Sequence, residues 1–578
     1  MFTKVLIANR GEIAVRVIRA CRELGIQSVA VYSELDRNAL HTRLADEAYA
    51  LGGQTAAESY LNTEKILDVI EKSQVDAVHP GYGFFSENAE FAKSITEKGV
   101  TFIGPPVEAI EVMGYKISAR QAAEKVGVTG VPGTTDFITK AKEVEAFAAD
   151  YGYPIAIKAA YGGGGRGMKV VRTKNEIQSA IDSAQREALA YFGRDEIYME
   201  RYLTKPRHIE VQVISDTHGN ALHLGTRDCS AQRRHQKLIE EAPAPLIPND
   251  ILDAMGQAAV DVAKGCGYVN AGTVEFLYEN DNFYYLEMNT RLQVEHPVTE
   301  MVTGIDLVEQ QIRIAFGEAL PFKQEDVQIA GHAIEVRINA EDPAEGQFLP
   351  SPGKLMTFKA SSGFGTRWDG GYEEGDEISQ FYDNLIGKLI CWGKDRDAAI
   401  ARTIRALKEF EVAGLRTTIP ADIAILTHHD FKAVEHSTKW VEETLDLKNV
   451  KGDHATSHDD SPSTTIRTAD IEVNGKRFDV SISVPNVSGQ IRRSASAVGS
   501  NAGGGDGQIT VPMQGTIVKI QTGIGDKVES GDVLVVLEAM KMENNITSDV
   551  NGTVVEINAE EGDAVGAGDV IIVIEAED

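Results

Sequence analysis

The segment that decides the fold reads EMNTRLQVEHP and spans residues 287–297. Polar side chains alternate along it, at Glu287, Asn289, Arg291, Gln293 and Glu295. In an extended chain these five share one face, with Met288, Leu292 and Val294 on the other. Carboxylate and amide oxygens suit Mg²⁺, which proteins usually share with nucleotide phosphates. The segment therefore indicates a metal and nucleotide site, and a charged hairpin without a metal is the alternative.

A strand and a turn come just before this segment. The strand–turn–strand pattern covers residues 273–288 and turns through Glu279-Asn280-Asp281-Asn282. We predict that the turn between the strands carrying Glu275 and Glu287 has an odd number of residues, so that both carboxylates face one way. Glu275, Glu287 and Asn289 are then the candidate metal ligands.

Four consecutive glycines begin at Gly162, further upstream. Glycines let backbone N–H groups approach phosphate oxygens without side-chain clash. Apolar strand residues flank the glycines, and neither a P-loop nor a dinucleotide fingerprint is present. The segment is either a phosphate-binding loop between two strands, with Lys158 just before it, or a flexible hairpin loop.

Two other short segments have the residue types of a binding site. Residues 233–237 read RRHQK, which suits phosphate or bicarbonate, although a solvated run of charges is the common alternative. Residues 79–84 read HPGYGF, a tight loop that a structural turn also explains.

The two ends of the chain differ in pattern. Residues 1–113 alternate short apolar strands with helical stretches, as expected for an open α/β sheet. Near the other end, 515–538 and 552–575 agree at 12 of 24 positions, which predicts two like half-sheets related by a pseudo-twofold axis. Lys541 lies between the copies, flanked by Met540 and Met542, and should be exposed at a hairpin tip. Exposed methionines on a turn indicate recognition rather than packing.

Composition sets limits on the function. The chain has 578 residues, too many for one hydrophobic core, so several domains are expected. Its net charge of −30 argues against a nucleic-acid partner, because a phosphate backbone requires a basic surface. It contains no apolar run long enough to span a membrane, and its N-terminus enters a strand at once, so we expect a cytoplasmic protein. The scattered cysteines suggest reduced thiols.

Six segments together resemble biotin carboxylase, and the resemblance runs over about residues 1–446. They read NRGEIAVR (9–16), HPGYGFFSEN (79–88), GGGGRGM (162–168), RDCSAQRRHQK (227–237), EMNTRLQVEHPVTE (287–300) and GHAIEVRINAED (331–342). EAMKME (538–543) resembles the biotinyl domain, in which a ligase attaches biotin to the lysine between two methionines. A lipoyl domain is the near alternative. The family pattern departs at Gly114-Tyr115-Lys116 and at Phe84-Phe85-Ser86.

The resemblance implies α/β and α+β domains followed by an all-β domain. The expected division is an N-terminal α/β domain (1–113), an ATP-grasp domain (114–330), a C-terminal domain (331–446), a linker with a β-hairpin at about 466–485 (447–507), and a flattened-barrel biotinyl domain (508–578). With the biotinyl segment the resemblance covers nearly the whole chain, which resembles the fused alpha subunits of bacterial acyl-CoA carboxylases, particularly those of the actinobacterial type.

The resemblance also implies roles for individual residues. ATP is expected at Lys116, Lys158, Gly163, Gly164, Gly165, Glu200, Arg201, Tyr202, Leu203, His208 and His235. Mg²⁺ (or Mn²⁺) is expected at Glu275, Glu287 and Asn289, bicarbonate at Lys237, Arg291, Gln293 and Val294, and biotin on Lys541. Glu295 is the expected general base, and Arg337 is expected to stabilise the biotin enolate.

The implied activity is a ligase reaction that forms a C–N bond on biotin, within an acyl-CoA carboxylase of fatty acid synthesis. The expected partners are a biotin protein ligase, a second copy of the chain and a carboxyltransferase beta subunit. Two rivals remain. Another ATP-grasp ligase would not need the biotinyl segment, and a biotin carrier with a decayed catalytic part should have lost metal or phosphate ligands.

Overall fold

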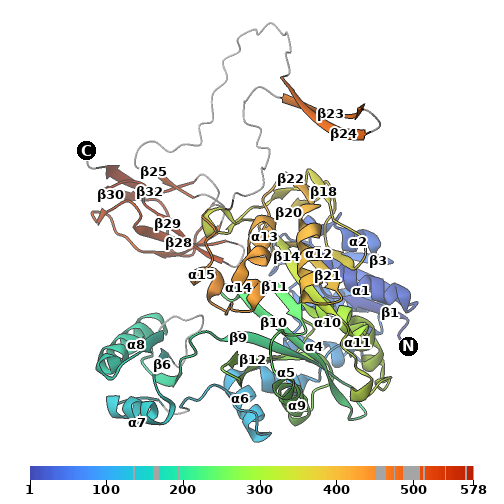
Figure 1. The fold of residues 1–578 in the computed structure, drawn as a ribbon, viewed down its shortest axis with the longest axis horizontal. Helices are drawn as coiled ribbons and strands as arrows, with labels where there is room; N and C mark the ends of the chain where they lie inside the picture. Colours follow the sequence, from blue (N-terminus) through green and yellow to red (C-terminus); the bar gives the residue numbers. More distant parts are fainter. Residues whose placement is uncertain are drawn as a thin grey trace. The chain divides into compact units, whose positions relative to one another are not determined.

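The computed structural model describes residues 1–134, 137–159, 168–192, 194–448, 450, 464–473, 476–485, 508–511, 515–539, 542–565 and 569–576. The chain divides into two compact units, Met1–Val412 with Thr417–Asp453, and Ala413–Arg416 with His454–Asp578. Within the described ranges no helix has the length and apolar content needed to cross a membrane. Figure 1 shows the elements of both units.

The first unit begins with a parallel five-stranded sheet in the order β3-β2-β1-β4-β5. Its strands are β1 (Lys4–Ile7), β2 (Gln27–Tyr32), β3 (Glu47–Ala50), β4 (Ala77–His79) and β5 (Thr101–Phe102). The helix α1 (Gly11–Glu23) follows β1 and buries Ile13, Val17, Ile18 and Cys21 at helical spacing. The open α/β sheet predicted for this region is confirmed.

An eight-stranded antiparallel sheet forms the centre of the same unit, in the order β13-β12-β9-β10-β11-β14-β21-β19. The strands are β9 (Arg207–Ser215), β10 (Ala221–Arg233), β11 (Gln236–Ala242), β12 (Asn270–Glu279), β13 (Asn282–Asn289), β14 (His332–Asn339), β19 (Thr366–Gly370) and β21 (Leu385–Gly393). On β9, Val211 and Val213 pack in a core with Met255 and Ala259 of α9 (Asn249–Gly265). Side chains alternate along a strand, so His208, Glu210 and Gln212 of β9 lie on the other face.

A small antiparallel sheet, β7-β6-β8, lies between the two larger sheets in sequence. It consists of β6 (Ile155–Ala159), β7 (Met168–Val171) and β8 (Ile197–Arg201), and its core includes residues of α7 (Ala141–Tyr151) and α8 (Ile177–Phe192). The strands on either side of the glycine segment pair as predicted, but the glycines themselves lie outside the described residues.

The remaining elements of the first unit are mostly short. The helices are α2 (Leu40–Leu44), α3 (Thr63–Ser73), α4 (Ala89–Thr96), α5 (Val107–Gly114), α6 (Lys116–Lys125), α10 (His296–Thr303), α11 (Leu307–Phe316), α12 (Arg396–Lys408), α13 (Ile419–Thr427), α14 (His429–Ala433) and α15 (Trp440–Glu443). The short strands are β15 (Glu341–Asp342), β16 (Leu349–Pro350), β17 (Gly353–Lys354), β18 (Thr357–Lys359), β20 (Glu377–Ile378) and β22 (Glu411–Ala413), the last of which ends in the second unit.

The second unit contains two four-stranded sheets, with the strand orders β25-β32-β30-β27 and β29-β28-β26-β31. Corresponding strands of the two repeat copies occupy the same places in the two orders. The strands are β25 (Gln508–Thr510), β26 (Gly515–Ile520), β27 (Lys527–Val528), β28 (Val533–Ala539), β29 (Met542–Thr547), β30 (Gly552–Ile557), β31 (Ala564–Val565) and β32 (Val570–Ala576). Adding the repeat offset of 37 residues converts β26, β27 and β28 into β30, β31 and β32. The two like half-sheets predicted from the repeat are therefore confirmed.

Two strand pairs of this unit flank the segments singled out in the sequence. β23 (Thr464–Val473) pairs with β24 (Lys476–Pro485) on either side of Asn474-Gly475. β28 pairs with β29 up to Ala539 opposite Met542. Lys541 lies between these strands in sequence but outside the described residues.

Candidate active site

One face of the eight-stranded sheet carries a row of charged side chains at paired positions. Glu287 on β13 pairs with Glu275 on β12, which in turn pairs with Glu210 on β9. Glu210 also pairs with Arg227 on β10. Paired residues of neighbouring antiparallel strands project from the same face. Three carboxylates and one guanidinium therefore lie side by side across four strands.

The alignment of Glu275 with Glu287 depends on a β-bulge. The connecting turn consists of Asn280 and Asp281, both at positive φ, so our prediction of an odd number of residues is wrong. Leu286 is an extra residue in β13 that shifts the register by one. Without it Glu287 would point away from the face that bears Glu275. The expected common face is present, but the bulge produces it rather than the turn.

Lys237 on β11 connects three buried carboxylates. Its Nζ forms an ion pair with Glu210 and lies 2.6 Å from Oε1 of Glu295 and 3.3 Å from Oε1 of Glu275. Burial opposes the charge of Lys237, but the carboxylates outweigh it and raise the pKa of Lys237 well above its usual range. Burial would likewise raise the pKa values of Glu275 and Glu295, yet Lys237 and neighbouring cations hold both below their usual range. These carboxylates are ionised at neutral pH.

The loop after β13 does not continue as a strand. β13 ends at Asn289, and α10 begins at His296 with Pro297 in its first turn. The single extended face expected over 287–295 is therefore wrong beyond Asn289, because the chain must turn into the helix. The bent loop still directs Gln293 to the carboxylates, since its Nε2 donates to Oε1 of Glu275 at 2.8 Å.

Arg291 and Asn289 form the outer side of this loop. Nη2 of Arg291 donates to Oδ1 of Asn289 at 2.9 Å, and Nε lies 3.0 Å from Oε2 of Glu87. Nδ2 of Asn289 donates to Oε1 of Glu275 at 2.8 Å. Arg291 therefore lies beside the candidate metal ligands rather than in contact with Glu295.

Arg337 on β14, the strand next to β11, contacts the carboxylate oxygen of Glu295 that Lys237 does not contact. Its Nη2 lies 3.0 Å from Oε2 of Glu295, and its Nε donates to Oε1 of Glu240 at 2.6 Å. Glu295 is thus held between two cations, one at each carboxylate oxygen. A carboxylate kept ionised in this way can accept a proton from a neighbouring acid.

His208 lies next to the metal-ligand candidates. Its Nε2 is 3.0 Å from Oε2 of Glu275 and 3.3 Å from Oε1 of Glu210. Burial opposes protonation of the ring, but these carboxylates raise the pKa of His208 to about 10. The imidazolium adds a further positive charge beside Glu210 and Glu275.

The residues expected to bind ATP lie on several elements of the first unit. Lys158 on β6 forms an ion pair with Glu200 on β8. Arg201 donates from Nη1 to the Tyr284 hydroxyl on β13 at 3.1 Å, which joins the small sheet to the central one. Residues 130–133 make a second connection, with bridges from Gly130 to Tyr285 and from Gly133 to Glu200.

Tyr202 and Leu203 follow directly after β8. The Lys439 ammonium lies over the ring of Tyr202, with Nζ 4.0 Å from the ring centroid. Leu203 is buried. Lys116 is the first residue of α6, and the exposed Tyr115 before it directs its ring away from the core. The candidate phosphate ligands Gly163, Gly164 and Gly165 fall outside the described part of the chain.

The turn between β10 and β11 carries His235 and is conformationally strained. Arg233 pairs with Gln236, so Arg234 and His235 form a two-residue turn, and both have positive φ. Asn and Gly normally occupy such turns, and other residues there cost about 1–3 kcal/mol each. The Arg234 N–H donates to Oε1 of Glu442 at 3.1 Å and helps to hold the turn. His235 is exposed at this turn.

Several residues of the site were not singled out from the sequence. Glu210 lies on β9, a strand whose nine residues are all buried although His208, Glu210 and Gln212 alternate with apolar residues. Arg227 donates to Glu210 and Gln293 from a fully buried position. Polar alternation in a strand that otherwise resembles core could have revealed Glu210, whereas Arg227 required knowledge of the strand pairing.

The candidate metal ligands suit a hard cation. Glu275 and Glu287 project side by side, and Asn289 adds an amide oxygen from the same strand as Glu287. Carboxylate and amide oxygens at one open edge suit Mg²⁺, which keeps several waters or phosphate oxygens as further ligands. His208, Glu210 and Glu275 also lie within 4.8 Å of one another, but Lys237 and Arg227 already neutralise their charge.

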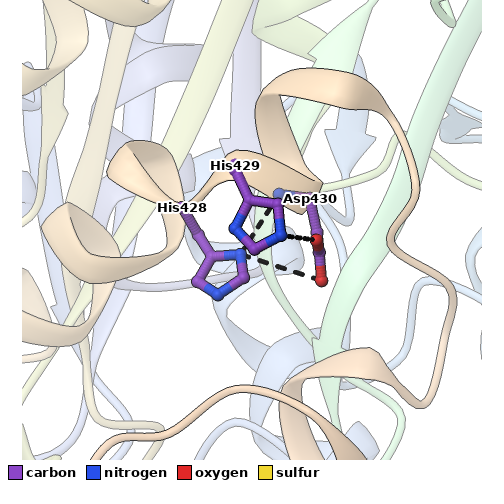
Figure 2. Close-up of side chains that lie close together, drawn as sticks. All are labelled: His428, His429 and Asp430. Atoms are coloured by element: carbon purple, nitrogen blue, oxygen red, sulfur yellow. Dashed lines mark hydrogen bonds and ion pairs between the residues drawn. The ribbon is translucent and has the colours of Figure 1, made fainter.

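A different group of potential metal ligands lies at the start of α14. Figure 2 shows His428, His429 and Asp430 close together. Nδ1 of His428 accepts the Asp430 N–H at 3.2 Å and caps the helix, and the Trp440 indole donates to Oδ2 of Asp430 at 2.8 Å. These contacts explain the cluster as a helix cap, and we assign no metal to it.

Four family models match the chain. They are "Biotin carboxylase, N-terminal domain" at residues 1–110, "Carbamoyl-phosphate synthase L chain, ATP binding domain" at 115–323, "Biotin carboxylase C-terminal domain" at 335–443 and "Biotin-requiring enzyme" at 507–574.

Curated relatives are similar over most of the chain. The biotin-dependent acyl-coenzyme A carboxylase alpha3 subunit of Mycobacterium leprae is 48% identical, and the match covers 94% of both chains. A pyruvate carboxylase subunit of Methanothermobacter thermautotrophicus is 52% identical, over 77% of this chain and 90% of the relative.

A solved structure of the biotin carboxylase domain dimer of Hydrogenobacter thermophilus 2-oxoglutarate carboxylase, with MgADP, ADP and bicarbonate, matches at a TM-score of 0.70. It is 47% identical and covers 77% of this chain and 98% of that chain.

Proposed function

The chain belongs to the biotin carboxylase family, with the catalytic domains fused to a biotinyl domain, and we propose that it carboxylates a biotin carried on its own Lys541. ATP and bicarbonate are the other substrates, and the carboxyl group passes to a carboxyltransferase on a separate chain. The single observation that carries this proposal is the position of Glu295, an ionised buried carboxylate held between Lys237 and Arg337.

Bicarbonate binds, in this proposal, among Lys237, Arg291, Gln293 and the Val294 N–H. Among the described residues no acceptor receives that N–H. Glu295 accepts the bicarbonate proton, and the resulting oxygen attacks the γ-phosphorus of ATP while the bond to ADP breaks. The carboxyphosphate so formed releases CO₂ and phosphate next to Arg337.

Lys116, Lys158 and the glycine segment hold the ATP phosphates, and Glu200–Leu203, His208 and His235 hold the rest of the nucleotide. Glu275, Glu287 and Asn289 would hold Mg²⁺, which would supply positive charge to neutralise the phosphates. The solved relative with bound MgADP, ADP and bicarbonate, 47% identical to this chain, supports the choice of these three ligands, nucleotide, Mg²⁺ and bicarbonate, as a set.

Lys541 is the proposed site of biotin attachment. The family model "Biotin-requiring enzyme" spans it, and β28 and β29 pair on either side of it. Biotin supplies the ureido nitrogen that takes up the carboxyl group, and the Arg337 guanidinium is placed to stabilise negative charge that develops on the ureido oxygen.

We propose an acyl-CoA, acetyl-CoA or propionyl-CoA, as the final acceptor, in fatty acid synthesis or related acyl metabolism. Among these relatives, the acyl-CoA carboxylase chain aligns over 94% of this chain, whereas the pyruvate and 2-oxoglutarate carboxylases align over 77%. The wider match includes the linker and the biotinyl domain, which must serve the carboxyltransferase. A biotin protein ligase and a second copy of the chain are further proposed partners.

The test measures ADP release and carboxylation of free biotin by the purified chain, with and without bicarbonate. We expect ADP release to require bicarbonate, and label from [¹⁴C]bicarbonate to appear in biotin. An equal rate of ADP release with and without bicarbonate would contradict the proposal. Transfer to acetyl-CoA, propionyl-CoA, pyruvate and 2-oxoglutarate, with a purified carboxyltransferase, then identifies the acceptor.

A further inference from the structure

Lys388 is a fully buried cation in the middle of β21, directly opposite Arg337 on β14. Paired residues share a face, so Lys388 lies beneath the same site as Arg337. Removing an ammonium group from water is costly unless it is paired and hydrogen-bonded. The contacts of Lys388 therefore indicate what this charge does.

The ammonium of Lys388 donates a hydrogen bond to a backbone carbonyl of residues 290–295, the loop between β13 and α10 that includes the proposed bicarbonate ligands. Its Nζ donates to the Val294 carbonyl at 2.6 Å and lies 3.3 Å from Oε1 of Glu12 on α1. The ring of Tyr82 lies 5.9 Å from Nζ, and the Tyr82 hydroxyl donates to Glu12. Burial opposes the charge, but Glu12, together with Glu335 and Asp369, outweighs it and raises the pKa of Lys388.

His296 holds the neighbouring peptide group. Its ring nitrogen Nδ1 lies 2.7 Å from the Gln293 carbonyl, and its backbone N–H donates to the same oxygen at 3.3 Å. Burial, with Lys388 and Arg16 nearby, lowers the pKa of His296 well below its usual range, so the ring is neutral. A neutral ring donates to a carbonyl from Nδ1 only in the tautomer that carries the proton there.

These two contacts fix Val294 on both sides. Peptide groups are planar, so each residue has only two soft backbone angles, one toward each neighbouring plane. His296 holds the plane that contains the Val294 N–H, and Lys388 holds the plane that joins Val294 to Glu295. The direction of that N–H and the starting point of the Glu295 side chain are then both determined.

We propose that Lys388 and His296 are positioning residues of the bicarbonate pocket, which clamp the two peptide planes of Val294. The inference rests on the proposed function, because it assigns the Val294 N–H to bicarbonate. Neither side chain touches the reacting atoms. They orient the Val294 N–H and the Glu295 carboxylate toward the same bicarbonate ion.

The test compares the KM for bicarbonate with the KM for ATP in bicarbonate-dependent ATP cleavage. Lys388→Met removes a charge-assisted hydrogen bond to the loop, and we expect the KM for bicarbonate to rise by about 10- to 100-fold. The KM for ATP should change by less than about threefold, within the usual effect of substitutions away from a ligand. Arg396→Gln is the matched control, since Arg396 also holds a carboxylate, Glu241, and two backbone carbonyls, those of Lys432 and Phe431.

A second variant keeps the proposal testable if Lys388→Met does not fold. His296→Leu should also raise the KM for bicarbonate selectively, and His296→Asn, which restores a donor near Nδ1, should recover most of that loss. Equal changes in both KM values, or an Arg396→Gln variant with the same bicarbonate defect, would overturn the proposal. If the unmodified chain cleaves ATP without bicarbonate, the proposed function fails instead.

Discussion

Glu275 lies directly opposite Glu287 across β12 and β13, although the turn between these strands contains only two residues. The bulge at Leu286 brings the carboxylates onto one face, where a divalent cation can bind both. We expect Glu287→Gln to weaken Mn²⁺ binding to the ADP-bound chain by about tenfold or more, since even the loss of a residue that only supports a metal ligand costs about 10- to 100-fold in affinity. The dissociation constant is measured by titration with Mn²⁺ followed by electron paramagnetic resonance.

Asp281→Asn, in the turn of the same hairpin, is the control and should bind Mn²⁺ like the unmodified chain. The same Mn²⁺ affinity in Glu287→Gln and Asp281→Asn would contradict the metal assignment.

Glu295→Gln preserves the shape of the side chain but removes the proton acceptor. Bicarbonate-dependent ATP cleavage should fall by about 10²- to 10⁴-fold, the range of general-base catalysis. Nucleotide affinity should stay within about threefold, because Glu295 is not a proposed ATP ligand. A rate near that of the unmodified chain would show that another group takes the proton.

Arg337→Gln should separate the two partial reactions. ATP cleavage in the absence of biotin does not need a charge at the ureido oxygen, so much of it should survive. Carboxylation of free biotin should drop sharply, by about 10²-fold or more, the scale for loss of one oxyanion donor. Arg337 also holds Glu295, so a small loss in ATP cleavage is expected. Equal losses in both reactions would argue against a role in stabilising biotin.

His79 should make stability depend on pH. Its Nδ1 accepts the Gly81 N–H at 3.0 Å, and burial lowers the pKa of His79 to about 4. An unfolded histidine has a pKa of about 6.5, so the unfolded state binds the proton more tightly. Stability present above pH 6.5 is then lost as the pH falls toward 4, by about 2 kcal/mol at pH 5.

The measurement is urea unfolding at pH 7 and pH 5. In His79→Asn the amide oxygen can still accept the Gly81 N–H, so the variant should lose about 2 kcal/mol less than the unmodified chain between these pH values. His218→Asn, at an exposed histidine, should behave like the unmodified chain. The same pH dependence in all three proteins would mean that His79 is not held neutral by the fold.

The features predicted well from the sequence are those set by local pattern. The alternation of apolar strands with helical stretches over residues 1–113 predicted the open α/β sheet, and the repeat at the C-terminal end predicted the two like half-sheets. The residue types of the site were likewise visible in the motifs.

What the sequence did not predict depends on how distant strands align. The number of residues in the turn between β12 and β13 does not reveal the bulge at Leu286. The bend after Asn289 follows from the helix that begins at His296. Lys388 was not singled out from the sequence, although a lysine within an apolar strand is a signal of a buried, paired charge. Its partner, the Val294 carbonyl, could not be inferred without the fold.

Lys541→Arg keeps the positive charge but cannot form an amide with biotin. Avidin blotting should detect biotin on the unmodified chain and none on the variant. The variant should still carboxylate free biotin, since the proposed catalytic residues lie in the first unit. Persistent labelling of the variant would place the biotin on a different lysine.

The most direct measurement incubates the biotinylated chain with ATP, Mg²⁺ and [¹⁴C]bicarbonate, with no carboxyltransferase present, and counts label bound to the protein. We expect one acid-labile carboxyl group per biotin, formed only with ATP, absent from the Lys541→Arg variant and formed about 10²- to 10⁴-fold more slowly in Glu295→Gln. Protein-bound label that forms without ATP or appears in Lys541→Arg, or label that forms at the unmodified rate in Glu295→Gln, would contradict a chain that carboxylates its own biotin by means of Glu295.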